Sequence, residues 1–313
     1  MNKQIRQLSL VMACWAAGSA AATELQRGVL IDRDHAQIVL MRPQGGIAAI
    51  DVLSGKPRWV NEHADMPMAM AKPHVLALAE PAKRGLLHYA VIDMESGALS
   101  SQKYVAISQP ARALVSDRLG EQFQIKADAN QLNWSYHHTH VSGALLADDS
   151  GPSRDGEAPK QAKENVSAVS LAGSFTFDSA DAKLVPVAAS KAAVREKPVA
   201  VEIGQPLPGA ARRFRSAGGE HVLVSQPIEQ GFYRWTVQNS KGQALGSLDS
   251  RHSYLPFDVV DGVLLFVQPL TMRFDKGDVE VQLPAVNAVQ LQDGKLLWTA
   301  EIRDTEFRGP FPP

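Results

Sequence analysis

Short apolar segments alternate with turn-forming residues along most of this chain. The segments have the period of two, or the continuous apolar character, that is typical of β-strands. The clearest of them are residues 37–41, 75–78, 123–127, 221–224 and 263–267. Glycine, aspartate, asparagine and serine separate them, and no long amphipathic helical pattern follows residue 22. The pattern therefore predicts an all-β fold of short antiparallel strands.

One phrase occurs twice, near the two ends of the chain. Residues 49–59 (AIDVLSGKPRW) align without a gap on residues 288–298 (AVQLQDGKLLW). Each copy consists of an apolar strand, a turn that closes on a glycine, a lysine, and a second strand that opens on a tryptophan. Recurrence of such a unit indicates a repeat architecture.

Weaker copies of this phrase lie between the two clear ones. Residues 91–97 (VIDMESG) keep the aspartate and the glycine but have Ser101 at the position of the tryptophan, and residues 235–242 (WTVQNSKG) form another strand and turn. Further turns are expected near Gly143 and residues 181–183. The side chains of Asp, Asn and Ser bond to nearby backbone, and glycine supplies the positive φ that a tight reversal needs. The expected structural repeat residues are Asp51, Gly55, Trp59, Asp93, Gly97, Trp235, Gly242, Gly294 and Trp298.

The first 22 residues have the features of a secretory signal. Lys3 and Arg6 precede a short apolar run, and small residues lead up to Ala22. We expect cleavage after Ala22 and a periplasmic or secreted protein. The alternative is a lipoprotein anchored through Cys14, which is the only cysteine. Cleavage after Ala22 would remove that thiol, which excludes a disulfide, a catalytic cysteine and a thiolate metal site.

Composition narrows the class of partner. The chain has 313 residues, of which 45% are hydrophobic, and 32 basic residues stand against 33 acidic ones. This near-neutral balance gives no electrostatic reason to expect nucleic acid. Beyond the signal, no stretch is long and apolar enough to span a membrane. We expect a monomer.

Two segments interrupt the strand pattern of the expected domain, which covers residues 23–313. Residues 148–165 are polar and rich in glycine, proline and charge, which predicts a solvated insertion. A linker between two domains is the alternative, but the two best repeat copies lie on opposite sides of this segment. Residues 303–313 form a proline-rich tail, which favours an extended conformation.

The repeated phrase resembles the repeat of the quinoprotein (PQQ) alcohol dehydrogenase-like β-propellers. The matching residues are Asp51, Gly55, Lys56 and Trp59 in one copy and Gly294, Lys295 and Trp298 in the last. The resemblance implies blades of four antiparallel strands, in which the turn glycine joins the third and fourth strands and the tryptophan packs between neighbouring blades. At about 40–45 residues per blade, it implies six or seven blades, with five also possible.

The resemblance also raises the hypothesis of a quinone-dependent dehydrogenase that uses PQQ with calcium. Members with that activity commonly carry adjacent cysteines and a calcium-binding set, whereas the mature chain has no cysteine and no recognisable calcium spacing. We therefore expect a non-catalytic binding or scaffold protein of the periplasm or envelope, without a cofactor, that binds a protein or small-molecule partner. The alternatives are a small quinone- or metal-dependent oxidoreductase and an outer-membrane assembly factor.

Three other clusters have a chemical interpretation and a structural one. His138 and His140 would share one face of a strand and are the candidate metal ligands, although ordinary strand histidines explain them as well. The basic patch at residues 212–215 could steer an anionic partner or form a solvated strand edge. The alternating methionines at residues 66–70 could bind Cu(I), but we expect them in the core.

Overall fold

The computed structural model describes most of the expected mature domain. The described residues are 23–79, 86–106, 121–128, 131–142, 165–178, 181–187, 211–229, 231–275 and 278–303. The expected signal segment with Cys14, the expected turn at Gly143, the polar insertion up to residue 164 and the tail after residue 303 lie outside these residues.

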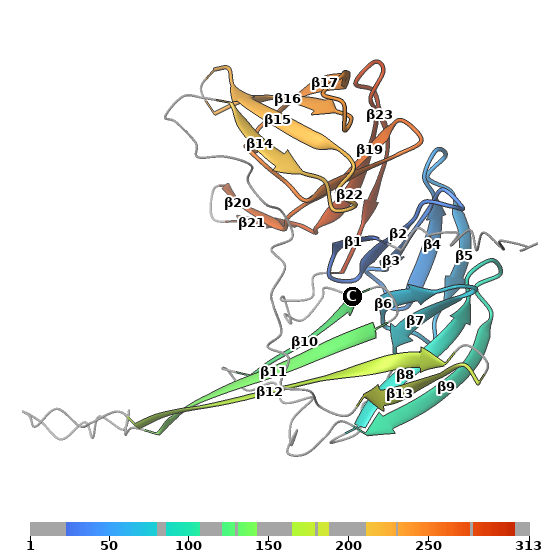
Figure 1. Ribbon diagram of the computed structural model, residues 1–313. Coiled ribbons are helices and arrows are strands. Elements are labelled where there is room, and N and C mark those ends of the chain that lie inside the picture. The colour runs from blue at the N-terminus through green and yellow to red at the C-terminus, as the bar shows by residue number, and fades with distance from the viewer. Residues whose placement is uncertain are drawn as a thin grey trace, which may run out of the picture.

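Every regular element that the structure describes is a β-strand, and the strands form antiparallel sheets (Figure 1). The first blade consists of β1 (Thr23–Gln26), β2 (Val29–Asp32), β3 (Gln37–Met41), β4 (Ile47–Asp51) and β5 (Pro57–Asn61). The second blade consists of β6 (Met66–Ala71), β7 (His74–Leu78), β8 (Leu86–Asp93) and β9 (Leu99–Ala106). The third blade consists of β10 (Glu121–Asp128), β11 (Gln131–Ser142), β12 (Asn165–Asp178) and β13 (Lys183–Val187).

The C-terminal part of the chain supplies two more blades. The fourth blade consists of β14 (Arg212–Arg215), β15 (Val222–Pro227), β16 (Tyr233–Gln238) and β17 (Ala244–Ser250). The fifth blade consists of β18 (Phe257–Val260), β19 (Val263–Gln268), β22 (Ala285–Gln290) and β23 (Leu296–Glu301). A separate hairpin, β20 (Thr271–Asp275) with β21 (Asp278–Gln282), lies between β19 and β22 in the chain.

Buried apolar clusters join neighbouring blades. One cluster joins the first and second blades, one the second and third, and one the fourth and fifth. A further cluster joins the fifth blade to the first, so that the last sheet of the chain packs on the first one. Within the described residues, no such cluster contains side chains of both the third and the fourth blade. Figure 1 shows the resulting curved array, with these two blades at its ends.

The all-β prediction and the four-stranded antiparallel blades are confirmed, and the described residues contain five blades, the lowest of the numbers that the sequence left open. The third blade, Glu121–Val187, is longer than the about 40–45 residues expected per blade, whereas the other four blades span about that length. In the third blade, β11 and β12 extend far along each other, and in the fifth blade the β20–β21 hairpin separates the second and third strands. The first blade also has an additional strand, β1, paired with β2.

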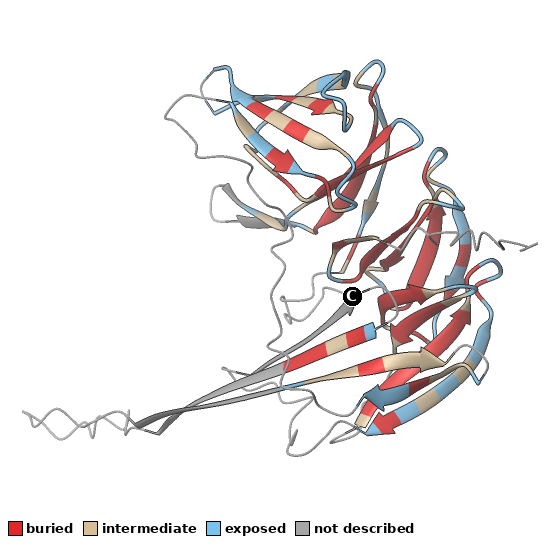
Figure 2. Ribbon diagram, in the orientation of Figure 1, coloured by how far each residue is buried: buried red, intermediate tan, exposed pale blue. Residues whose placement is uncertain are grey.

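Burial differs between the blades (Figure 2). In the first, second and fifth blades the central strands β3, β8 and β22 are buried on both faces, because each sheet lies between two others. In the fourth blade, β15 and β16 alternate between buried and more exposed residues. The predicted methionine core is confirmed, since Met66, Met68 and Met70 on β6 are all buried.

Candidate functional site

The turn between the third and fourth strands has the same geometry in the first two blades. In the first blade, the Ser54 amide and hydroxyl both donate to Asp51 Oδ1 at 2.8 Å, and the Gly55 amide donates to the Asp51 carbonyl at 2.9 Å. The second blade repeats these bonds with Asp93, Ser96 and Gly97. The φ angles of 69° and 71° at the two glycines explain why glycine occupies this position.

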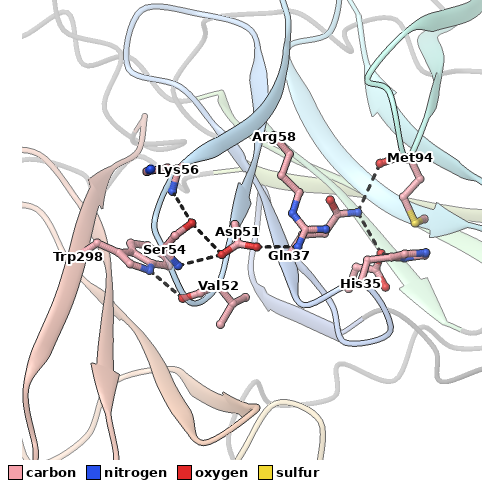
Figure 3. A network of polar contacts seen from close by, with 10 residues as sticks. His35, Gln37, Asp51, Val52, Ser54, Lys56, Arg58, Met94 and Trp298 are labelled. Atoms are coloured by element: carbon pink, nitrogen blue, oxygen red, sulfur yellow. Dashed lines mark hydrogen bonds and ion pairs between the residues drawn. The ribbon is translucent and has the colours of Figure 1, made fainter.

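An arginine also stabilises the turn of the first blade. Arg58 Nη2 lies 2.6 Å from Asp51 Oδ2 (Figure 3). This hydrogen bond, together with those from Ser54, lowers the pKa of Asp51 to about 2. The carboxylate therefore stays ionised and keeps the turn in place.

Trp298 connects the fifth blade to this turn of the first blade. Its indole N–H donates to the Val52 carbonyl at 2.8 Å, as Figure 3 shows. The indole also covers Gly55, because a Cβ atom at that residue would lie 2.5 Å from Trp298 Cγ. The glycine is therefore required both for its backbone angle and for the space that the tryptophan occupies.

Trp59 makes the same connection between the first and second blades. Its indole N–H donates to the Met94 carbonyl at 2.9 Å, and a Cβ on Gly97 would lie 2.5 Å from Trp59 Cγ. The two tryptophans also share a strand register, since Trp59 pairs with Ala49 and Trp298 with Ala288, each beside a bulge. The repeated phrase of the sequence thus corresponds to a contact between adjacent blades.

The fourth blade replaces this tryptophan by a glycine. Gly246 pairs with Val237 beside the same bulge, which places it at the register of Trp59 and Trp298. A Cβ atom on Gly246 would clash with the Leu291 carbonyl of the fifth blade. Leu291 lies three residues before the turn glycine Gly294, as Val52 lies three residues before Gly55, so its carbonyl corresponds to the one that accepts the Trp298 indole N–H. At this position of the fourth blade, the backbone of β17 therefore takes the place of the indole.

The second and fourth blades also depart from the pattern. In the second blade Ser101 stands at the tryptophan register, and Lys103 Nζ instead donates to the Asp181 and Ala182 carbonyls of the third-blade turn at 2.6 and 3.0 Å. In the fourth blade the turn glycine, Gly242, has a φ of 80°, but apart from its chain neighbours no atom of the described residues lies within 4 Å of the position of its Cβ. No tryptophan of the described residues therefore covers that turn.

Trp235 differs from the other two repeat tryptophans. It lies on β16, the third strand of its blade, and is fully buried against the fifth blade. Its indole N–H donates to the His252 carbonyl at 2.9 Å, and its ring contacts Phe266 edge-on. The sequence carries this distinction, because Trp235 precedes its turn glycine whereas Trp59 and Trp298 follow theirs.

A cleft lies where turns of the first, fourth and fifth blades meet. Its volume is about 420 Å³, within the range of small-molecule sites. The described residues that line it are Arg33, Glu220, His221, Leu245, Val259, Val260, Asp261, Gly262, Gln290, Leu291 and Gln292. Sequence reasoning missed this site, because its residues come from turns that are distant in the chain.

Arg33 connects the three blades at one side of the cleft. Its Nη2 atom lies 2.6 Å from both carboxylate oxygens of Asp258, which is completely buried on β18. Its Nη1 atom lies 2.7 Å from Glu220 Oε2 in the fourth blade. The Gly218 amide also donates to Asp258 Oδ2 at 3.2 Å, and a Cβ on Gly218 would clash with the guanidinium. The turn at Gly218 and Gly219 thus leaves space for the arginine.

The residues next to Arg33 link the first blade to the second. The buried Asp32 carboxylate lies 2.6 Å from His35 Nδ1 and accepts a hydrogen bond from Gln37 Nε2 at 3.0 Å. Gln37 Nε2 also lies 3.4 Å from the Met94 carbonyl, the acceptor of the Trp59 indole (Figure 3). The turn between β2 and β3 is therefore bonded to the fourth and fifth blades through Arg33 and to the second blade through Gln37.

His221 is the cleft residue with an unsatisfied polar atom. Its Nδ1 atom is buried and has no hydrogen-bond partner within the described part of the chain. Burial lowers the pKa of His221, and the nearby Arg33 guanidinium acts in the same direction. The lowered pKa favours the neutral form of this imidazole.

Among the described residues, no sheet packs on the face of the fourth blade that points away from the fifth. Strand pairing aligns Arg213 with Val224 and Arg215 with Val222 on this face, and none of its residues is buried. The complete set is Arg213, Arg215, Val222, Val224, Gln226, Arg234, Thr236, Gln238, Ser247 and Asp249. We call it the uncovered face. The opposite face contains Phe214, Leu223 and Trp235 and packs on the fifth blade.

The structure separates the basic patch predicted at residues 212–215. Arg213 and Arg215 lie on the uncovered face, whereas the guanidinium of Arg212 lies over the Phe214 ring at 5.2 Å. Arg234 pairs with Asp249 through two bonds of 2.8 and 3.1 Å. Arg213 reaches only the Gln238 amide oxygen, at 3.4 Å, so two arginines of this face have no carboxylate partner among the described residues.

His138 and His140, the candidate metal ligands, belong to β11 by their backbone, as predicted, but their side chains lie outside the described residues. Among the described side chains, no three histidine, cysteine, aspartate or glutamate residues are grouped so that they could hold a metal ion. The same residues contain no helix that is long and apolar enough to cross a membrane.

No family model and no curated protein matches this sequence. Among solved structures, the chain is similar to a europium-containing methanol dehydrogenase, with 13% identity over 91% of this chain and 70% of that chain and a TM-score of 0.25. The chain is also similar to an uncharacterized protein from Listeria monocytogenes EGD-e, with 8% identity over 92% of this chain and 95% of that chain and a TM-score of 0.28. A third similar structure is the β-propeller domain of Cps50 from Myceliophteria thermophila, with 9% identity over 90% of this chain and 89% of that chain and a TM-score of 0.23. These values assign no function to the chain.

Proposed function

We propose that this protein is an exported binding or scaffold protein of the cell envelope that holds an acidic protein partner against the uncovered face of the fourth blade. One observation carries the proposal: no other sheet of the described residues packs on this face, which combines three arginines with two half-buried valines. Export to the periplasm is part of the proposal and rests on the signal features of residues 1–22.

The charges of the uncovered face favour an acidic partner. It contains three arginines and one aspartate, and that aspartate is already paired with Arg234. Arg213 and Arg215 are exposed and have no carboxylate partner within the described residues. Guanidinium groups bind carboxylates through two parallel hydrogen bonds, so these side chains suit aspartate and glutamate on a partner surface.

The side chains between the arginines favour a protein over a small ion. Val222 and Val224 are half-buried on this face and offer apolar contact area beside the two arginines. Thr236 lies in the same row as Arg213 and Val224, near the middle of the sheet. A partner surface that combined carboxylates with apolar groups would match this arrangement.

Charge reversal tests the proposal. We expect Arg213→Glu combined with Arg215→Glu to abolish most photo-crosslinking from a crosslinker at position 236 to an envelope protein. The matched control is Lys56→Glu with Lys295→Glu, two exposed lysines on turns of the first and fifth blades, which we expect to leave the crosslink unchanged. High salt should weaken the wild-type crosslink, because exposed charge pairs are screened.

Three results would contradict the proposal. The first is equal crosslinking in the charge-reversed variant and the control variant. The second is a crosslinked partner that has no acidic surface. The third is recovery of the full-length chain from the cytoplasm after cell fractionation. A crosslinker at position 53, on an exposed turn of the first blade, reports whether any crosslink is specific to the uncovered face.

A further inference from the structure

The cleft between the first, fourth and fifth blades has features of a ligand site separate from the uncovered face. Turns from three blades form its walls, and its floor is apolar, with Val259, Val260 and Leu291 buried. Leu245, on β17, also lines the cleft, and its side chain is 37% exposed. An aliphatic chain of a ligand could lie along these side chains and remove them from water.

The polar groups of the cleft carry an excess of negative charge. Arg33 is the one cationic lining residue among those described, and two carboxylates, of Asp258 and Glu220, already contact it. Glu220 uses only its Oε2 atom for this contact, and Asp261 adds a further exposed carboxylate. The net charge of the cleft therefore favours a cationic group.

Uncharged polar groups complete the set. His221 lines the cleft beside Glu220. Gln290, the last residue of β22, and Gln292, on the following turn, add amide groups.

We infer that the cleft binds an alkyl cation, an aliphatic chain that ends in an ammonium or guanidinium group. The chain would contact Leu245 and the valines, and the cation would lie between the carboxylates of Glu220 and Asp261. Free polyamines carry this chemistry, and so do lysine and arginine side chains of a peptide.

Calorimetric titration of the mature protein tests the inference. The probes are spermidine, the peptides acetyl-Ala-Lys-Ala-amide and acetyl-Ala-Arg-Ala-amide, and the same peptide with norleucine as the uncharged control. We expect Glu220→Gln and Asp261→Asn each to weaken binding of a cationic probe about two- to five-fold, the range for exposed ion pairs. Asparagine tolerates the positive φ of 49° at residue 261, so that variant keeps the turn.

Glu229→Gln, which removes an exposed carboxylate on the turn between β15 and β16, is the matched control and should leave the affinity unchanged.

Binding of spermidine alone supports a free polyamine as ligand, and binding of the basic peptides supports a protein segment. The inference is overturned if the norleucine peptide binds as tightly as the lysine peptide, if neither variant changes the affinity, or if no cationic probe binds. Arg213→Glu with Arg215→Glu should leave this titration unaffected, which separates it from the proposed partner surface.

Discussion

Replacing Trp59 with alanine is expected to lower the free energy of unfolding by about 3–5 kcal/mol, the range for truncating a large buried aromatic side chain. Trp59 is 7% exposed between the first and second blades, where it covers Gly97 and donates to the Met94 carbonyl. Its removal would leave a cavity and take one hydrogen bond from that carbonyl. Urea denaturation followed by circular dichroism measures the change.

A variant of the same blade provides the control for Trp59. Leu53 is 53% exposed on the turn of the first blade, and Leu53→Ala should change the stability by less than about 0.5 kcal/mol. Trp298→Ala should cost less than Trp59→Ala, because Trp298 is only partly buried. Equal stability of Trp59→Ala and Leu53→Ala would show that the indole does not hold the two blades together.

Arg33→Met is expected to destabilise the protein by about 3–5 kcal/mol, because it leaves the completely buried carboxylate of Asp258 without its cation. The loss should be much smaller when Asp258→Leu is added, since replacing both members of a buried ion pair by apolar residues is often tolerated. The measurement is again the free energy of unfolding in urea.

Arg42 offers a matched comparison for Arg33. It pairs with Glu62 at 3.8 Å, and the Glu62 side chain is 82% exposed, so Arg42→Met should cost no more than about 1 kcal/mol. If the two arginine variants lose the same stability, Arg33 is a surface residue in solution and does not connect the three blades. If the double variant is no more stable than Arg33→Met, the pairing with Asp258 is not the cause of the loss.

The sequence predicted the local units of this fold well. The paired Asp, Ser and Gly of the first two turns predicted their hydrogen bonds, because all the groups involved lie within a few residues of each other. The repeat also indicated that Trp59 and Trp298 are equivalent, and they occupy the same register. Short-range chemistry of this kind can be read directly from the order of residues.

Contacts between blades were harder to predict. Arg33 and Asp258 are separated by 225 positions, and neither belongs to the repeated phrase. Gly246 gives no repeat signal, because it is a glycine at the register of a tryptophan and acts through close backbone approach. The number of blades depended on the long β11–β12 pair of the third blade, which the average blade length does not anticipate.

The central claim is that a tryptophan on the fourth strand of one blade packs on the turn glycine of the next. Gly97 and Gly242 have similar φ angles, 71° and 80°, but only Gly97 lies under an indole ring. Gly97→Ala should therefore cost clearly more stability than Gly242→Ala in the native protein. In the Trp59→Ala background the two glycine substitutions should cost the same, whereas equal costs in the native protein would contradict the claim.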